Sequence, residues 1–248
     1  MDIIAERKTK TVYKDQETVV KLFIKDYSKA SILNESLIHA RVEENTKLNI
    51  PKLLEVKKFA SRWAITTEYI EGKTLDVLMK EHPEKEDEYL KMFVKLQLEI
   101  LSNQVPLLNR IKDKFRRKLT DTKVINDNIK YELLQRLVGM KNHTKLCHGD
   151  FNPSNVIVNP SGKCYIIDWS HATQGNASAD VARTFLIFSM QQENELADKY
   201  LELFVKESGI EKSNIQRWIP IVAATQLTKE NPEEEEFLRS WIDIVDFE

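Results

Sequence analysis

Residues 146–169 read LCHGDFNPSNVIVNPSGKCYIIDW and carry the most specific pattern in the chain. Two short apolar runs, VIV and YII, are typical of strands, and the turn-forming segment NPSG separates them. This pattern predicts a β-hairpin. Asp150 and Asn155 lie on the loop that enters the hairpin, and Asp168 lies at its exit. Closure of the hairpin therefore brings three oxygen-bearing side chains to the same side of the sheet.

Carboxylate and carboxamide oxygens suit Mg²⁺, which binds one or two carboxylates together with water and the phosphates of a substrate. The remaining carboxylate is then available as a base. Phosphoryl transfer needs this combination, because its transition state is stabilised by positioning and by positive charge near the phosphate oxygens. A turn-rich hairpin with solvated carboxylates is the simpler interpretation of either half of the stretch, but it does not account for both halves at this spacing.

The segments HGDFNPSN and IIDW resemble the catalytic loop and metal-binding signature of the aminoglycoside phosphotransferase and choline kinase family. The resemblance implies a protein-kinase-like fold that phosphorylates small molecules and uses Mg²⁺ with ATP or GTP as co-substrate. It implies that Asp150 orients and deprotonates the acceptor hydroxyl. It also implies that Asn155 and Asp168 hold the metal ion.

A second pair of charged residues lies near the amino terminus. Lys21 interrupts an otherwise apolar strand, and Glu35 shares a helical stripe with Ile38 and Val42. A lone strand lysine is often solvent-exposed, but a carboxylate on the packed face of a helix needs a cation. The pair resembles the strand lysine and helix glutamate of kinase-like folds, which hold the α- and β-phosphates. We therefore assign nucleotide binding to Lys21 and Glu35.

The expected phosphate loop between the first two strands, AERKTKT at residues 5–11, contains no glycine, and the first glycine of the chain is Gly72. Without glycine a backbone approaches a phosphate less closely. A non-catalytic kinase-fold protein that binds nucleotide or another ligand is therefore kept as the alternative function. The side chains that are candidates to replace the missing glycines are those of Lys8, Thr9, Lys10 and Thr11.

The segment EYIEGKTL at residues 68–75 is similar to the family's linker between lobes. The resemblance implies that the backbone carbonyl of Glu68 and the backbone amide of Ile70 bind the edge of the nucleotide base. The same residues are also typical of a strand-to-helix turn, and the two interpretations are compatible. We expect a nucleotide-binding lobe at residues 1–70 and a catalytic and substrate-binding lobe at residues 71–248.

After residue 74 the apolar residues follow the period of helices. They predict one long helix around residues 89–100, another around 126–140, and between them a stripe of Leu107, Ile111, Phe115 and Leu119 with a dense basic run. We interpret the basic run as a solvent-exposed helix face, with a nucleic-acid or anionic-lipid site as the alternative.

The segment after Trp169, residues 170–178, is small and polar and is predicted to be a loop. Asp180 follows near the start of a helix, and the family resemblance implies that it steadies the catalytic loop. The brevity of this loop, together with Gly149 in place of the arginine of protein kinases, disfavours a protein substrate. The chain end is weakly similar to the acidic and aromatic tails with which some aminoglycoside kinases reach the amines of their substrate, through Asp243, Asp246, Phe247 and Glu248.

The composition is that of an ordinary globular protein, with 42% hydrophobic residues and a net charge of −2 from 37 basic and 39 acidic residues in 248. This balance gives no global field for nucleic acid. No apolar run approaches the ~18–20 residues of a membrane helix, and the amino terminus does not resemble a signal peptide, so we expect a cytoplasmic protein without membrane contact. Cys147 and Cys164 are expected to be free thiols.

Together these patterns predict an α+β, protein-kinase-like fold of two lobes, in which a small antiparallel sheet with one helix precedes a larger, mostly helical lobe that contains the catalytic hairpin. The predicted reaction moves the γ-phosphoryl group of a Mg²⁺-nucleoside triphosphate to a hydroxyl of a small molecule. The aminoglycoside-like, choline-like and sugar-like classes of acceptor stay open. No protein partner is implied.

Overall fold

The computed structural model describes residues 2–191 and 193–242, and the chain divides into two compact units. Unit 1 comprises Met1–Glu86, Val105–Leu107 and Pro153–Ala172, and unit 2 comprises Asp87–Gln104, Leu108–Asn152 and Thr173–Glu248. Asn155 and Asp168 therefore belong to unit 1, whereas Asp150 belongs to unit 2. The predicted lobes at 1–70 and 71–248 divide the chain by function, and that division stays a prediction.

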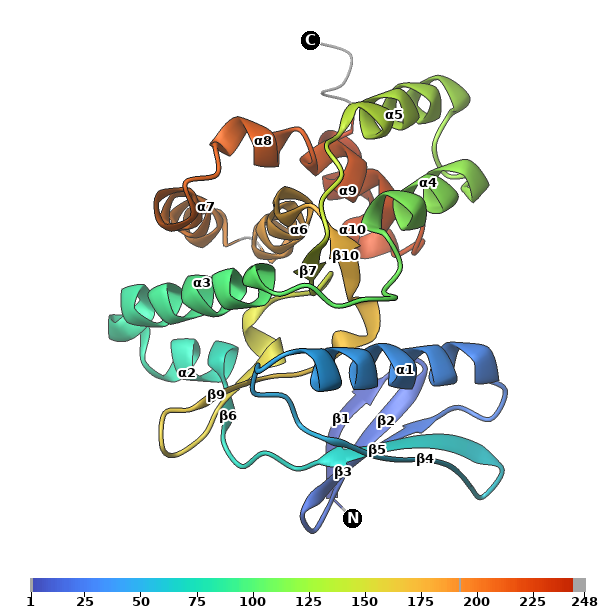
Figure 1. Cartoon of the computed structure of the whole chain (residues 1–248), viewed down its shortest axis with the longest axis vertical. Helices are drawn as coiled ribbons and strands as arrows, with labels where there is room; N and C mark the ends of the chain where they lie inside the picture. Colours follow the sequence, from blue (N-terminus) through green and yellow to red (C-terminus); the bar gives the residue numbers. More distant parts are fainter. Residues whose placement is uncertain (1, 192, 243–248) are drawn as a thin grey trace. The chain divides into compact units, whose positions relative to one another are not determined.

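Unit 1 is built on a five-stranded antiparallel sheet in the order β1-β2-β3-β5-β4, with helix α1 along one of its faces (Figure 1). Phe23, Ile32 and Ile65 form a buried cluster between them. Ser28 caps the helix by accepting a hydrogen bond from the backbone N–H of Ser31 at 3.3 Å. The elements are β1 (Asp2–Arg7), β2 (Lys10–Asp15), β3 (Thr18–Phe23), α1 (Lys29–Asn45), β4 (Leu53–Phe59) and β5 (Arg62–Glu68).

The predicted hairpin is present in unit 1, where it forms a second antiparallel sheet in the order β6-β8-β9. The backbone N–H of Ile167 donates to the carbonyl of Asn155 at 3.0 Å and closes the base of the hairpin. The remaining elements of unit 1 are β6 (Lys73–Thr74), α2 (Leu75–Glu81), the short helices η1 (Pro83–Lys85), η2 (Pro153–Asn155) and η3 (Trp169–His171), and the hairpin strands β8 (Val156–Val158) and β9 (Cys164–Ile166).

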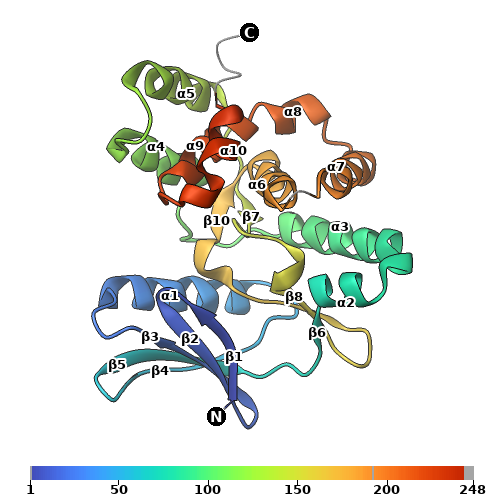
Figure 2. The ribbon, with the colours of Figure 1, turned by 180° about the vertical axis from the view of Figure 1, so that it is seen from behind.

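Unit 2 is mostly helical and is centred on α6, in which every residue except Met190 is buried. Helices α7 and α9 both pack against α6 (Figure 2). Phe93 of α3 stacks on Phe151 with ring centroids 4.3 Å apart. The elements are α3 (Glu86–Ser102), α4 (Ile111–Asp121), α5 (Asp127–Gly139), β7 (Lys145–Cys147), β10 (Thr173–Gly175), α6 (Ala177–Met190), α7 (Asn194–Ser208), α8 (Lys212–Gln216), α9 (Ile219–Leu227) and α10 (Pro232–Ser240).

These elements confirm the predicted α+β class, with an antiparallel amino-terminal sheet, one helix on it and a helical carboxy-terminal part.

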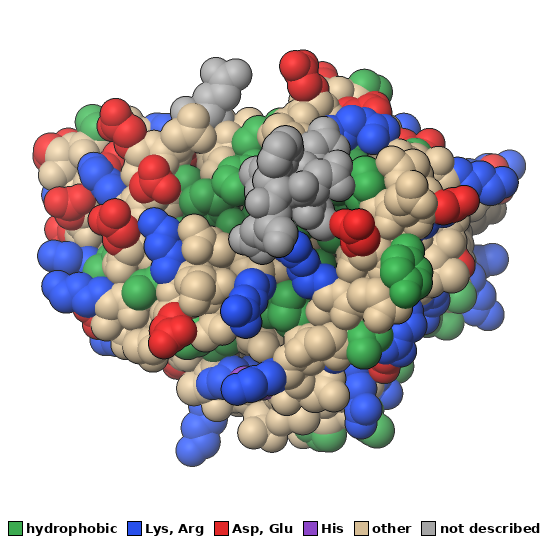
Figure 3. Space-filling view, turned by 90° about the horizontal axis from the view of Figure 1, so that it is seen from above, with side chains coloured by type: hydrophobic (Ala, Val, Ile, Leu, Met, Phe, Trp, Pro, Cys, Tyr) green, Lys and Arg blue, Asp and Glu red, His purple; other side chains and the backbone are tan. Residues whose placement is uncertain are grey.

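No described helix is long and apolar enough to cross a membrane. Burial raises the pKa of the Cys147 thiol well above its ordinary value, and both cysteines are free thiols. On the face drawn in Figure 3, acidic and basic side chains are interspersed.

Two local predictions were wrong. Leu107 does not continue the stripe of α4, because it adopts a left-handed conformation at φ 64° and is 75% exposed, while the neighbouring Leu108 is buried. The segment predicted as a loop contains strand β10, which pairs with β7. This strand is only three residues long and is made of small and polar residues, so no alternating apolar pattern marks it in the sequence.

Gly72 allows strand β6 to lie against β8. A Cβ atom at this position would overlap the carbonyl oxygen of Val158, and its φ of 151° is rarely adopted by other residues. We predict that Gly72→Ala lowers the free energy of unfolding by about 1–3 kcal/mol, measured by urea denaturation. Gly162→Ala is the matched control, because its φ is also positive while a Cβ there meets no atom within 4 Å. If the two variants lose the same free energy of unfolding, the close approach of Gly72 to the carbonyl of Val158 is not what requires glycine at this position.

Candidate functional site

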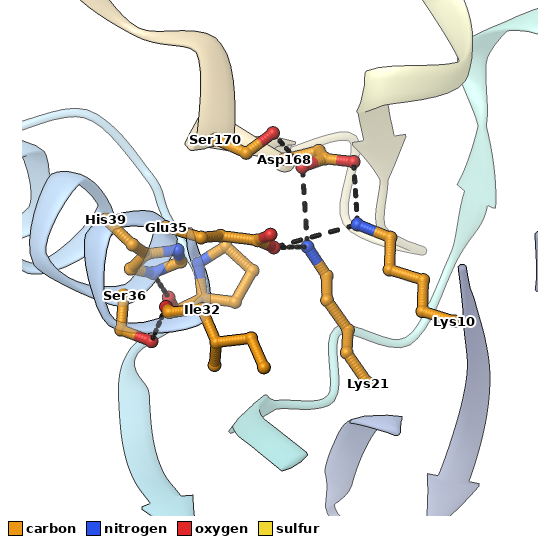
Figure 4. Close-up of polar contacts among 9 residues, drawn as sticks. Lys10, Lys21, Ile32, Glu35, Ser36, His39, Asp168 and Ser170 are labelled. Carbon is orange, nitrogen blue, oxygen red and sulfur yellow. Dashed lines mark hydrogen bonds and ion pairs between the residues drawn. The ribbon is translucent and has the colours of Figure 1, made fainter. Parts of the chain in front are cut away.

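Four charged side chains meet in unit 1 (Figure 4). The Nζ of Lys21 lies 3.0 Å from Oε1 of Glu35 and 3.4 Å from Oδ1 of Asp168. The Nζ of Lys10 lies 3.7 Å from the same Glu35 oxygen and 3.8 Å from Oδ2 of Asp168. Two cations and two anions therefore alternate, and they join neighbouring strands of the sheet, helix α1 and the end of the hairpin.

Burial of the Lys21 ammonium by itself lowers its pKa, but the carboxylates of Asp168 and Glu35 outweigh burial and raise the pKa above 10.5. The stability that this arrangement contributes is therefore fully present below about pH 10.5 and is lost only as the pH rises through the folded-state value. Nearby His39 behaves in the opposite way, because burial lowers its pKa while its Nε2–H donates to the carbonyl of Pro51 at 2.8 Å. The Lys21 ammonium therefore keeps its charge at neutral pH.

Asp168 has a left-handed backbone at φ 60° and ψ 61°, a conformation that aspartate tolerates better than most residues. The hydroxyl of Ser170 donates to its Oδ1 at 3.0 Å (Figure 4). Asn155 is buried, and its carbonyl accepts the hydrogen bond that closes the hairpin. The hairpin thus fixes the backbones of both predicted metal ligands, as the sequence led us to expect.

Asn155 and Asp168 fit a magnesium ion by their chemistry, because both offer the hard oxygen donors that Mg²⁺ prefers and both line the same cavity. Among the described residues no group of three or more His, Cys, Asp or Glu side chains could hold a metal ion. A cation at this place would need additional ligands, and Mg²⁺ commonly takes them from substrate phosphates and water.

The cavity in unit 1 has a volume of about 620 Å³, which is large enough for a nucleotide. Its lining includes each predicted unit 1 site residue: Lys21, Glu35, Glu68, Ile70, Asn155 and Asp168. Lys10 also lines it, as do apolar residues from β2, β3 and the hairpin. Residues that were predicted separately from four segments of the sequence therefore line the same cavity.

Asp150 lies in unit 2 on a loop that one face of α6 holds in place. The carboxylate of Asp180 accepts a hydrogen bond from the backbone N–H of Gly149 at 2.6 Å, and Gly149 has a positive φ of 80°. The Nη2 of Arg183 donates to Oδ1 of Asp150 at 3.0 Å, and the hydroxyl of Thr184 donates to the carbonyl of Phe151 at 2.8 Å. Asp180, Arg183 and Thr184 are spaced i, i+3, i+4, so they lie on one face of the helix.

Asp180 is at the centre of a buried polar network. Burial raises its pKa, whereas hydrogen bonds from the backbone of Gly149 and His148 and from the Gln97 side chain act to lower it. Gln97 also donates to the hydroxyl of Thr184 at 3.2 Å and accepts a hydrogen bond from the Tyr200 hydroxyl. The predicted role of Asp180 in steadying the loop agrees with these contacts.

Two residues at the site were not assigned from the sequence. Arg183 follows Asp180 by three positions, and helical spacing was the signal that would have placed it beside the predicted catalytic loop. Lys10 was only one of four candidates to replace the missing glycines. The acidic residues Asp243, Asp246 and Glu248 lie outside the described residues.

We predict that Asp180→Ala lowers the free energy of unfolding by about 1–3 kcal/mol, because it leaves the partly buried Gly149 N–H without its acceptor. Asp180→Asn retains an acceptor oxygen, so its free energy of unfolding should fall by less than that of Asp180→Ala. Thermal and urea unfolding provide the measurement, and Asp113→Ala on the exposed side of α4 is the control, with an expected change within about 0.5 kcal/mol. An Asp180→Ala protein as stable as the control would refute this role.

Two of three comparisons find proteins that are similar to this chain. A search of curated protein sequences finds no significant match. Among solved structures, a thermostable mutant of the aminoglycoside phosphotransferase APH(4)-Ia, in ternary complex with ADP and hygromycin B, matches at TM-score 0.74 and 14% identity over 98% of this chain and 92% of that one. A choline kinase from Streptococcus pneumoniae matches at TM-score 0.65 and 17% identity over 98% of this chain and 91% of that one. These similarities show the fold.

The family model described as the phosphotransferase enzyme family matches residues 6–212, and the chain therefore belongs to the phosphotransferase enzyme family.

Proposed function

We propose that the protein transfers the γ-phosphoryl group of Mg²⁺-bound ATP or GTP to a hydroxyl group of a small molecule. Family membership supports the class of reaction. The observation that carries the proposal is the convergence of Lys21, Asn155 and Asp168 on one cavity of unit 1. Similarity to a protein crystallised with ADP and hygromycin B supports the use of a nucleotide and a small acceptor.

On the nucleotide side, Lys21 supplies positive charge to the phosphates and Glu35 holds Lys21 in place. This assignment is supported by the 3.0 Å contact between them and by the raised pKa of Lys21, which keeps the ammonium charged. The backbone groups of Glu68 and Ile70 at the cavity wall bind the edge of the base. Lys10 adds a second positive charge beside the first two strands, where other kinases use glycine-rich backbone.

Asn155 and Asp168 would hold Mg²⁺ through their side-chain oxygens, and the ion would supply positive charge to the phosphate oxygens. The side chain of Asp168 is one-third exposed and contacts two lysines. The hydroxyl of Ser170 donates to the Asp168 carboxylate and orients it.

On the acceptor side, Asp150 accepts the proton of the attacking hydroxyl. The acceptor oxygen forms a bond to the γ-phosphorus, and the bond between that phosphorus and the β–γ bridging oxygen breaks, so the nucleoside diphosphate leaves with the electron pair. Arg183 positions the Asp150 carboxylate through their 3.0 Å contact. Asp150 precedes Asn155 by five residues, which limits the backbone separation to at most about 18 Å.

A non-catalytic nucleotide-binding protein is the second candidate. It is favoured by the turn between β1 and β2, Lys8-Thr9, which has no glycine to bring backbone amides onto a phosphate. This candidate predicts metal-dependent nucleotide binding with no hydrolysis and no transfer to any acceptor. A cytoplasmic location stays a prediction from the sequence.

We predict that calorimetric titration finds Mg²⁺-dependent binding of ATP or GTP by the wild-type protein. Asp168→Ala should abolish the dependence on Mg²⁺, because Asp168 supplies the carboxylate ligand. Asp113→Asn, an exposed change of the same charge, is the control and should bind as wild type does. Metal-dependent binding that persists in Asp168→Ala would refute the assignment of the metal site.

We predict that Asp150→Asn slows the acceptor-independent hydrolysis of the bound nucleotide by about 100-fold to 10,000-fold, because the base is lost. Nucleotide affinity should be unchanged, since Asp150 does not line the cavity of unit 1. A coupled assay of diphosphate release gives the rate, and calorimetry gives the affinity. Measurable wild-type hydrolysis with no loss in Asp150→Asn would reject Asp150 as the base, and no wild-type hydrolysis would favour the second candidate.

A further inference from the structure

Of the four candidates to replace the missing glycines, one lines the cavity of unit 1. The hairpin of β1 and β2 closes with Arg7 paired to Lys10, so its turn consists of Lys8 and Thr9 alone. Neither turn residue lines the cavity, and Thr11 does not line it either. Lys10, the first residue of β2, does line it. A phosphate in this cavity is therefore met by the Lys10 side chain and not by backbone amides of the turn.

The Lys10 ammonium group makes ion pairs but no hydrogen bond among the described residues. Its Nζ lies 3.7 Å from Glu35 and 3.8 Å from Asp168, and both distances are too long for a hydrogen bond (Figure 4). Lys21, in contrast, donates to Glu35 at 3.0 Å. The three N–H donors of Lys10 therefore lack an acceptor in the described part of the chain, although only 16% of the side chain is exposed. A phosphate oxygen in the cavity would supply one.

The stem of Lys10 is packed before any ligand arrives. Phe23 lies directly opposite Lys10 in the pairing of β2 with β3, and it is 1% exposed. The Lys10 Nζ lies 5.8 Å from the centroid of the Phe23 ring. A side chain that is already ordered in the free protein loses less conformational freedom when it binds a ligand. The packing therefore favours a ligand-binding role for Lys10.

The strand register gives the order of the two lysines along the site. Thr18 of β3 lies opposite Glu68, whose backbone carbonyl is proposed to bind the base. Lys21 is three residues farther along β3, and Phe23, which is opposite Lys10, is five residues farther. At about 3.3 Å per residue, these positions lie roughly 10 Å and 17 Å from the base-binding end of the strand. The backbone of Lys10 is therefore farther from the base than that of Lys21, as a terminal phosphate is.

Lys10 also sets the charge of the four-residue cluster. Two lysines facing two carboxylates give this cluster no net formal charge. Without Lys10, the cluster would carry one excess negative charge and would repel the phosphates of any nucleotide. A hydrogen bond from Lys10 to one particular phosphate, in contrast, affects only nucleotides that have that phosphate. The two effects can therefore be separated by comparing nucleotides of different phosphate number.

We propose that Lys10 makes the site specific for nucleoside triphosphates, because its ammonium group binds the terminal phosphate of the nucleotide in place of a glycine-rich loop. The proposal rests on the proposed function, since it takes the cavity of unit 1 to hold the nucleotide. It adds a division of tasks in which Lys21 binds the phosphates nearer the base and Lys10 binds the γ-phosphate. Because the γ-phosphoryl group is the group transferred, Lys10 also stabilises negative charge on it.

The first test compares nucleotides that differ by one phosphate. Calorimetry measures the binding of AMP-PNP and ADP, and of GMP-PNP and GDP, to the wild-type protein and to Lys10→Gln with Mg²⁺ present. Lys10→Gln should weaken binding of the triphosphate analogue about tenfold to hundredfold, the effect of one hydrogen bond between charged groups. The diphosphate should lose at most about threefold, from the change in cluster charge alone. If both nucleotides lose affinity equally, Lys10 acts only through that charge and the proposal is wrong.

The second test uses matched variants, each verified as folded by thermal unfolding. Lys8→Gln removes the same charge from the exposed turn outside the cavity, and it should bind both nucleotides as the wild type does. Lys10→Arg keeps the charge and should keep the triphosphate preference within about threefold. Arg7 also lines the cavity but donates to the carbonyl of Glu6, so Arg7→Gln should have a smaller effect than Lys10→Gln. An equal loss of triphosphate preference in Lys8→Gln or Arg7→Gln would overturn the specific role of Lys10.

The third test needs no variant and therefore does not depend on the folding of Lys10→Gln. A crystal structure of the wild-type protein with AMP-PNP or GMP-PNP and Mg²⁺ should place the Lys10 Nζ about 2.7–3.2 Å from an oxygen of the γ-phosphate. Lys21 should contact the phosphates nearer the base. A bound analogue whose γ-phosphate lies more than about 4 Å from the Lys10 Nζ would overturn the proposal.

Failure of this proposal and failure of the proposed function give different results. If the wild-type protein binds no nucleotide, both are wrong. Nucleotide binding with equal losses of triphosphate and diphosphate affinity in Lys10→Gln overturns only the role of Lys10. A triphosphate preference that depends on Lys10, without hydrolysis or transfer, supports the role of Lys10 and overturns phosphoryl transfer.

Discussion

The Lys21 ammonium held between Glu35 and Asp168 is the interaction on which the site in unit 1 depends. A buried ammonium group needs anionic partners, and here they come from a helix next in the chain and from a hairpin 147 residues away. Strand, helix and hairpin must therefore all be in place before the charge is balanced. The same requirement fixes Asp168 at the cavity wall with its side chain partly exposed.

Helix α6 organises unit 2 by a similar principle. Three side chains on one face of this buried helix bind the backbone of Gly149, the carboxylate of Asp150 and the carbonyl of Phe151. Gly149, Asp150 and Phe151 are thus each held by a separate polar contact, and Phe93 stacks on the ring of Phe151. These contacts leave the Asp150 carboxylate few alternative orientations, which suits the proposed role of a base because positioning contributes much of the rate in phosphoryl transfer.

Much of the fold and part of the site could be predicted from local sequence patterns. The hairpin was predicted from two apolar runs around a turn, and Lys21 with Glu35 from a charge on each of two packed faces. The environment of the basic run was not predictable, because the partial burial of Lys114 and Lys118 depends on packing between α4 and the distant helix α9. Strand β10 is defined by its pairing with β7, which is also a long-range contact.

We propose that Lys21 and Asp168 serve the nucleotide and its metal ion. The central claim of this account is that a divalent ion binds Asn155 and Asp168 together with nucleotide phosphates. The most direct measurement is anomalous X-ray scattering from crystals grown with Mn²⁺ and a non-hydrolysable analogue of ATP or GTP. The account predicts an anomalous peak within coordination distance of the Asp168 carboxylate, the Asn155 side-chain oxygen and the analogue's phosphates. A nucleotide bound in the cavity with manganese coordinated elsewhere, or with neither residue as a ligand, would contradict it.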